Sequence, residues 1–156
     1  MVTHRRKPIL TIDSGRQFLG EAVRQIKRDR PFDLVATVLL PDHWHLVMGL
    51  PRGDSGYSMR MKRIKEEFTR RWKISTPGET IIWQSRFWEH TVRDLADLEN
   101  CVDYIHWNPR KHDLVSRVRD WEYSSFHRFV REGHYSNDWG GVAPTVIGRK
   151  RDWGEP

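Results

Sequence analysis

The chain has 156 residues, and a composition of 37% hydrophobic and 31% charged residues is typical of one globular domain. The single cysteine, Cys101, excludes an internal disulfide and a cysteine-rich zinc motif. No apolar stretch has the length of a signal peptide or a membrane span, so we expect a cytoplasmic protein. With 27 Lys and Arg against 21 Asp and Glu, the net charge of +6 favours a polyanionic partner such as nucleic acid, although a solvated basic surface accounts for this charge equally well.

The first third of the sequence predicts a helix followed by a β-hairpin. Apolar residues at helical spacing predict a helix from an N-cap at Ser14 to about residue 30, where Pro31 ends it. The β-rich segment 32–40 and the segment 43–50 are predicted to be two strands joined by a turn at 41–42. The opening residues MVTH have the character of the end of a strand, so we expect a truncated first strand.

The segment 57–73 predicts an amphipathic helix with a basic surface. Its apolar stripe is expected to pack in the core and consists of Tyr57, Met61, Ile64, Phe68 and Trp72. The other faces carry most of the excess positive charge, which predicts contact with nucleic-acid phosphates, the alternative being a solvated face. The candidate DNA-binding residues on this helix are Arg60, Lys62, Arg63, Lys65, Arg70 and Arg71.

The second half of the sequence predicts further short elements. Residues 81–93 are expected to form one or two short strands, and Asp94 is expected to cap a helix that runs to about residue 107 and is stopped by Pro109. Residues 121–130 predict a short helical segment, and residues 140–156 predict a flexible basic tail. Antiparallel strands interleaved with helices predict an α+β fold with helices packed on a small antiparallel sheet.

His43 and His45 are separated by one residue on a predicted strand. Residues i and i+2 of a strand point to the same face, so the two imidazoles form a possible pair of metal ligands, although two histidines this close also occur by chance. A later helix offers candidates for the rest of a site. Tyr104 and Asn108 are one turn apart, and they would supply a nucleophilic hydroxyl and a carbonyl oxygen for a hard cation such as Mg²⁺, or else a core tyrosine and a helix-terminal asparagine.

Four segments, taken in order, resemble a known enzyme family. They are PDHWHLV (41–47), IWQSRFWEHTVRD (82–94), YIHWNPRKHDLV (104–115) and WEYSSFHRFV (121–130). The sequence is similar to the single-tyrosine HUH transposases of the insertion-sequence type, and most of all to the REP-associated tyrosine transposases of bacteria. The resemblance extends from about residue 3 to residue 139, which predicts one transposase domain over 1–139 followed by the tail.

The resemblance implies a ferredoxin-like HUH palm and a metal-dependent enzyme that cuts and joins single-stranded DNA. His43 and His45 would bind Mg²⁺ or Mn²⁺, with Asn108 as a third ligand, and Tyr104 would attack the DNA to give a 5′-phosphotyrosine and a free 3′-hydroxyl. Family members of this type act on palindromic repeats that fold as hairpins, as monomers or homodimers. Among the remaining basic residues, Arg86, Arg110 and Lys111 are candidates for contact with DNA, with surface positions as the alternative.

Two other functions remain open from the sequence. The truncated first strand is compatible with a catalytically weakened or domesticated protein that binds DNA hairpins without cutting them. A metallohydrolase that uses a metal-bound water would cut DNA without forming a covalent adduct at Tyr104.

Overall fold

The computed structural model describes residues 1–78, 81–85 and 89–141. The chain divides into two compact units. The first comprises Met1–Val35, Leu40–His43 and Met48–Arg86, and the second comprises Ala36–Leu39, Trp44–Val47 and Phe87–Pro156. Within the part of the chain that the structure describes, no helix combines the length and apolar character needed to cross a membrane.

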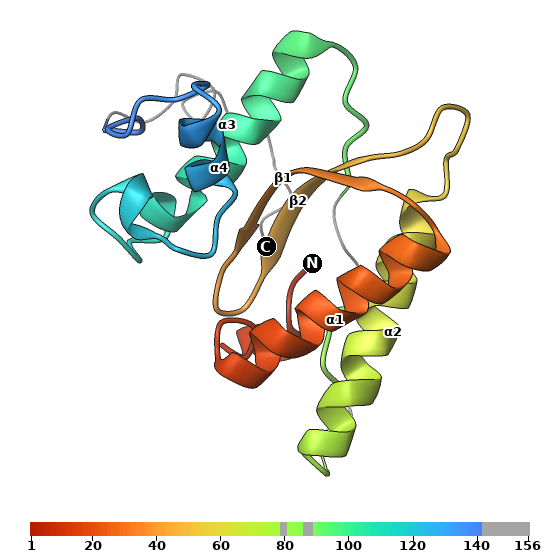
Figure 1. Cartoon of the computed structure of the whole chain (residues 1–156). Helices are drawn as coiled ribbons and strands as arrows, with labels where there is room; N and C mark the ends of the chain where they lie inside the picture. Colours follow the sequence, from red (N-terminus) through yellow and green to blue (C-terminus); the bar gives the residue numbers. More distant parts are fainter. Residues whose placement is uncertain (79–80, 86–88, 142–156) are drawn as a thin grey trace. The chain divides into compact units, whose positions relative to one another are not determined.

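The first unit is built on two long helices, α1 (Asp13–Asp29) and α2 (Tyr57–Ser75), which lie side by side (Figure 1). Aromatic rings join them: Phe18 meets Trp72 edge to face at 6.4 Å between ring centroids, and Trp72 stacks on Phe68 at 5.7 Å. Four of the five predicted stripe residues of α2, from Met61 to Trp72, are buried. The apolar spacing therefore identified the buried face of this helix correctly.

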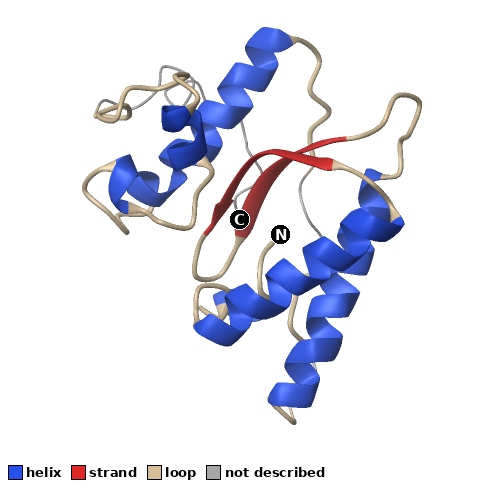
Figure 2. Cartoon of the chain, viewed as in Figure 1, coloured by secondary structure: helices blue, strands red, loops and turns tan. Residues whose placement is uncertain are grey.

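Strands β1 (Asp33–Leu39) and β2 (Trp44–Gly49) form the antiparallel hairpin that the sequence predicts (Figure 2). Residues 2–4 add backbone pairing in the first unit. Val2 forms an antiparallel bridge with His43, Thr3 forms one with Trp83, and the amide of His4 donates to the carbonyl of Ile82. The predicted first strand therefore consists of isolated bridges followed by a short 3₁₀ turn, η1 (His4–Arg6).

The second unit contains α3 (Leu95–Lys111), η2 (Val118–Asp120) and α4 (Phe126–Arg131). Residues 123–125 pair with β1, since the amide of Leu39 donates to the carbonyl of Tyr123 and Val38 bridges Ser124. The fully buried His106 of α3 makes a 2.7 Å hydrogen bond between its Nε2 and Oγ of Ser125. Burial, with smaller contributions from Arg128 and His127, lowers the pKa of His106 to about 3, so this ring is neutral at pH 7.

The α+β prediction is confirmed, but several predicted elements have different bounds. The helical segment predicted over 121–130 begins at Phe126, as α4. Helix α1 begins at Asp13, with Ile12 rather than Ser14 as its N-cap. Helix α3 begins at its predicted cap, Asp94, whose side chain accepts a hydrogen bond from the amide of Asp97, but it continues past Pro109 to Lys111. In the described parts of 81–93, the only β-bridge is that of Trp83, so the predicted strands are reduced to a single pairing there.

Pro109 does not stop α3 because it lies in the last turn of the helix. A proline removes one backbone donor, and it interferes with the carbonyl four residues earlier rather than with the residues that follow it. After Pro109, the amides of His112 and Leu114 donate to the carbonyls of Asn108 and Pro109, which closes the helix end. The extra turn places Lys111 on the helix that carries Tyr104.

Candidate functional site

His43 is buried in the first unit and is held by an acidic neighbour. Its Nδ1–H donates to Oδ1 of Asp42 at 2.6 Å, and Arg6 donates to the other carboxylate oxygen of Asp42 at 2.7 Å. Burial alone would raise the pKa of Asp42, but the hydrogen bonds from His43 and Arg6 outweigh it and lower the pKa to about 2. Asp42 is therefore ionised at neutral pH. In the neutral ring, this contact fixes the tautomer of His43, with the proton on Nδ1 and the lone pair on the buried Nε2.

His45 lies in the second unit beside the predicted nucleophile. Its ring meets the ring of Tyr104 edge to face, with the centroids 5.7 Å apart and an interplanar angle of 87°. The neighbouring Trp44 is buried and donates from Nε1 to the hydroxyl of Thr37 at 2.5 Å, which anchors β2 to β1. The structure thus brings together His45 and Tyr104, which are 59 positions apart in the sequence.

One face of α3 carries Tyr104, Asn108 and Lys111. Tyr104 is only 3% exposed and Asn108 is fully buried, including its Oδ1 atom. The ammonium of Lys111 donates to the hydroxyl of Tyr104 at 3.1 Å and lies 4.9 Å from the centroid of the Tyr104 ring. Successive positions four and three apart on a helix share a face, so this grouping follows from the helix continuing through Pro109.

The prediction that Arg60 belongs to an exposed basic face is wrong. Arg60 is 1% exposed, and its guanidinium binds both carboxylate oxygens of Asp54 at 2.6 and 3.1 Å. It also donates to the carbonyls of Arg30, Pro31 and Gly56. These hydrogen bonds connect α2 to the loop before it and to the end of α1. The guanidinium of Arg60 is therefore not available to a DNA phosphate.

The other predicted DNA-binding residues fall into two groups. Lys62 and Arg70 are exposed and form ion pairs with Glu66 and Glu67 of their own helix, and Arg63 is half-buried. Lys65, Arg71 and Arg110 are partly buried and contact Gln84, Glu21 and the carbonyls of residues 140–141, respectively. Arg86 and residues 142–156 of the predicted tail lie outside the described residues. Lys62 and Arg70, which are exposed, are therefore the better candidates for contact with an external polyanion.

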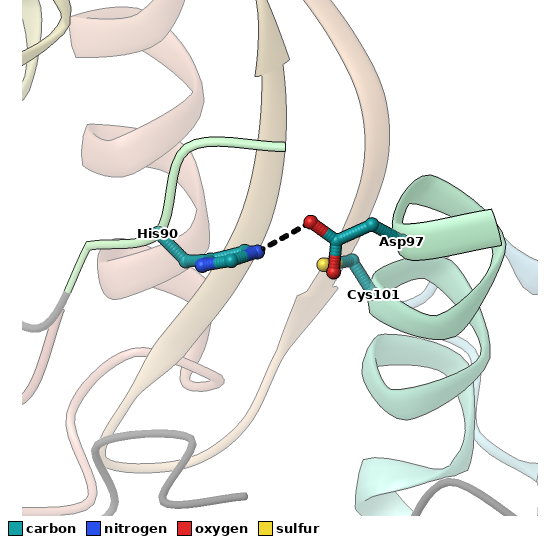
Figure 3. A group of neighbouring side chains, drawn as sticks. All are labelled: His90, Asp97 and Cys101. Carbon is teal, nitrogen blue, oxygen red and sulfur yellow. Dashed lines mark hydrogen bonds and ion pairs between the residues drawn. The ribbon is translucent and has the colours of Figure 1, made fainter. Parts of the chain in front are cut away.

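A second cluster of possible metal ligands lies at the start of α3. Figure 3 shows His90 facing Asp97 and Cys101, and the potential ligand atoms of the three residues lie within 4.8 Å of one another. The Oδ2 atom of Asp97 accepts from Nε2 of His90 at 2.7 Å and from Nε of Arg93 at 3.2 Å. These hydrogen bonds, with that from His90 the largest, hold the pKa of Asp97 well below its usual range.

The Oδ2 atom of Asp97 is already engaged by His90 and by the positive guanidinium of Arg93. We therefore interpret this cluster as a structural contact that holds residues 90–93 against the first turn of α3. Neither this cluster nor the contact of Asp42 with His43 was predicted from the sequence. The signal for the cluster was the spacing of residues 97, 101, 104 and 108, which predicts one helix face.

Comparison with known proteins places these residues in context. A family model described as "Transposase IS200 like" matches residues 1–108. The REP-associated tyrosine transposase of Escherichia coli (strain K12) is 45% identical over 138 residues, which cover 88% of this chain and 79% of that protein. The putative REP-associated tyrosine transposase of Haemophilus influenzae is 46% identical, with 77% of this chain and 73% of the relative covered.

A solved structure matches over nearly the whole chain. It is that of a REP-associated tyrosine transposase bound to a REP hairpin, with 43% sequence identity and a TM-score of 0.81. The match covers 92% of this chain and 84% of that chain. The region matched by the family model contains His43, His45, Tyr104 and Asn108, whereas Lys111 follows it.

Proposed function

The chain belongs to the IS200-like transposase family, and we propose that it cuts and rejoins single-stranded DNA through a covalent bond to Tyr104. The observation that carries this proposal is the contact of Tyr104 with His45 and with Lys111, which places its phenol next to an imidazole and an ammonium in the second unit. A phenol is a weak nucleophile at neutral pH, so it requires an electrophile whose charge is stabilised by its surroundings.

The chemistry of the proposed step balances without a redox partner. The Tyr104 oxygen forms a bond to phosphorus as the bond from phosphorus to the 3′ oxygen breaks. The phenolic proton passes to solvent, and the departing 3′ oxygen takes one proton from solvent. The product is a 5′-phosphotyrosine and a free 3′-hydroxyl, and attack by another 3′-hydroxyl on the phosphotyrosine would reverse the step and join a new strand.

We propose that His43, His45 and Asn108 would hold a divalent cation, Mg²⁺ or Mn²⁺. The chemistry of these residues suits such an ion. The ring of His43 is oriented by the Asp42 carboxylate, as is common for metal-binding histidines, and Asn108 offers a buried carbonyl oxygen. The two imidazole nitrogens favour Mn²⁺ over Mg²⁺ as the more tightly bound ion. When bound, the cation would polarise the scissile phosphate and neutralise its charge.

We propose DNA hairpins as the substrate class, because a relative that is 43% identical over 92% of this chain was solved with a REP hairpin. The exposed cations Lys62 and Arg70 on α2 are the residues we assign to the DNA backbone. Each phosphate contact of this kind releases bound counterions, so binding should weaken steeply with added salt.

The direct test is to trap the covalent intermediate. The protein is incubated with Mn²⁺ and a labelled oligonucleotide that carries a palindromic hairpin with single-stranded flanks, and the label is followed on a denaturing gel. Wild-type protein should carry the label, and Tyr104→Phe should not. A labelled Tyr104→Phe protein would remove Tyr104 as the nucleophile. Cleavage without any adduct would indicate a metal-bound water, and binding without cleavage would indicate a hairpin-binding protein.

A further inference from the structure

Lys111 is a cation in direct contact with the hydroxyl of Tyr104, the proposed nucleophile, in the second unit. Its Nζ atom lies 3.1 Å from the Tyr104 oxygen and 4.9 Å from the centroid of the ring. Both residues project from one face of α3, seven positions or about two helical turns apart. The lysine therefore approaches the hydroxyl from the same rigid helix that carries the tyrosine.

The contact leaves the positive charge of Lys111 in place. Its hydrogen bond goes to a neutral phenol, and such a bond does not neutralise an ammonium group. An ammonium in this position can act on any negative charge that develops at the Tyr104 oxygen.

We propose that Lys111 orients the hydroxyl of Tyr104 for attack and then binds a non-bridging oxygen of the phosphate in the covalent intermediate; the inference rests on the proposed function. The Tyr104 oxygen becomes the bridging atom of the phosphotyrosine. The non-bridging oxygens are bonded to the same phosphorus, so they come within reach of an ammonium that already contacts the bridging atom. Lysine serves as a compact point charge for phosphate and has three donors, so it can keep the first contact while it makes the second.

The negative charge that develops on the Tyr104 oxygen during the reaction explains the role of Lys111. The hydroxyl oxygen of Tyr104 gains negative charge as its proton leaves, and the phosphate carries one negative charge before and after the transfer. A cation fixed beside the transferring phosphate stabilises the transition state more than the unreacted phenol, so its loss should slow the bond-forming step rather than weaken DNA binding.

The test separates the rate of adduct formation from the affinity for DNA. Excess protein reacts in a single turnover with the hairpin oligonucleotide and Mn²⁺, and the rate constant at saturation and the half-saturating protein concentration are measured for each variant. Lys111→Met, which has nearly the same shape without the charge, should reduce the saturating rate constant about 100-fold. The half-saturating concentration should change by no more than a few-fold. Lys111→Arg, which restores the charge, should recover the rate to within about tenfold of wild type.

The control is Arg131→Met, which removes one exposed cation from the end of α4 in the same unit and should leave the rate constant unchanged. Circular dichroism establishes that each variant is folded, and Lys111→Gln replaces Lys111→Met if the latter is not. A wild-type rate for the uncharged variant, or equal losses for the uncharged and arginine variants, would overturn the inference. Failure of the proposed function is distinct, because it would appear as the absence of an adduct in the wild type or its persistence in Tyr104→Phe.

Discussion

Replacing Arg60 with methionine should destabilise the protein while leaving its affinity for DNA nearly unchanged. Methionine fills much of the same space but removes the hydrogen bonds of the guanidinium to Asp54 and to the carbonyls of Arg30, Pro31 and Gly56. A bond to a charged partner contributes about 1.5–3 kcal/mol and a neutral one about 1 kcal/mol. The carbonyls of the exposed residues Arg30 and Pro31 can bind water instead, which reduces the loss.

The expected loss in the free energy of unfolding is about 2–4 kcal/mol, since such contributions are not fully additive. For a chain of this length that corresponds to a fall in Tm of roughly 5–15 °C. Urea and thermal unfolding followed by circular dichroism measure both quantities. The matched control is Lys62→Met, which removes an exposed cation from the same helix and should change stability by less than about 0.5 kcal/mol.

The same variant should alter the response to acid. The hydrogen bond from Arg60 is the largest cause that lowers the pKa of Asp54 to about 2, below the ordinary value of about 3.9. The ion pair therefore contributes fully above about pH 4 and is lost as the pH falls towards 2. Wild-type protein should lose this contribution to stability over that range, and Arg60→Met should not.

Affinity for DNA distinguishes the structural role of Arg60 from a binding role. Lys62→Met should weaken binding of the hairpin oligonucleotide and reduce the dependence of log K on log[salt] by about one. Arg60→Met, measured where it remains folded, should do neither. Wild-type stability of Arg60→Met, combined with the weakened and less salt-dependent binding expected of Lys62→Met, would mean that Arg60 contacts DNA and has no structural role.

Three further predictions concern packing, the orientation of His43 and the start of α3. Gly15→Ala should cost about 1–3 kcal/mol of stability by urea unfolding, because its Cβ would lie 1.9 Å from the carbonyl oxygen of Ile9, whereas Gly20→Ala meets only the end of a flexible arginine and should be neutral or stabilising. Asp42→Asn should raise the Mn²⁺ concentration that gives half-maximal adduct formation by about 10–100-fold, while an unchanged requirement would contradict its role in orienting His43. Asp97→Asn should lower the free energy of unfolding by about 1–3 kcal/mol, and a wild-type urea midpoint would show that the contacts to Asp97 are dispensable.

The sequence predicted the regular elements better than it predicted which cations are exposed. The stripe from Met61 to Trp72 was assigned correctly because a helical period reports directly on a buried face. The same period placed Arg60 among solvated residues, yet it is buried, because a carboxylate six positions earlier in a loop pairs with it. Such pairing depends on how the loop 51–56 folds back, and no helical period contains that information.

The contacts of the residues around the proposed site were also only partly predictable from the sequence. The spacing of Tyr104 and Asn108 was sufficient to place them on one helix face, because both lie before Pro109. Lys111 could not be placed with them, since a proline in the last turn and a proline that ends a helix have the same sequence pattern. The contact of Asp42 with His43 was also missed, because an aspartate next to a proline at a hairpin turn is sufficiently explained by the turn itself.

Helix α3 holds Tyr104, the proposed nucleophile, in a fixed position. The helix is fixed at its start by the Asp94 cap and by the contacts of Asp97 to His90 and Arg93. Tyr104 therefore projects from the middle of a fastened helix rather than from a loop, and Lys111 projects from the same face. If Tyr104 is the nucleophile, as proposed, its position on the same rigid helix as Lys111 would keep their mutual geometry when DNA binds, and the entropy cost of aligning them would be met during folding. We infer that DNA binding must expose the hydroxyl of Tyr104, which is 3% exposed, but need not realign it with Lys111.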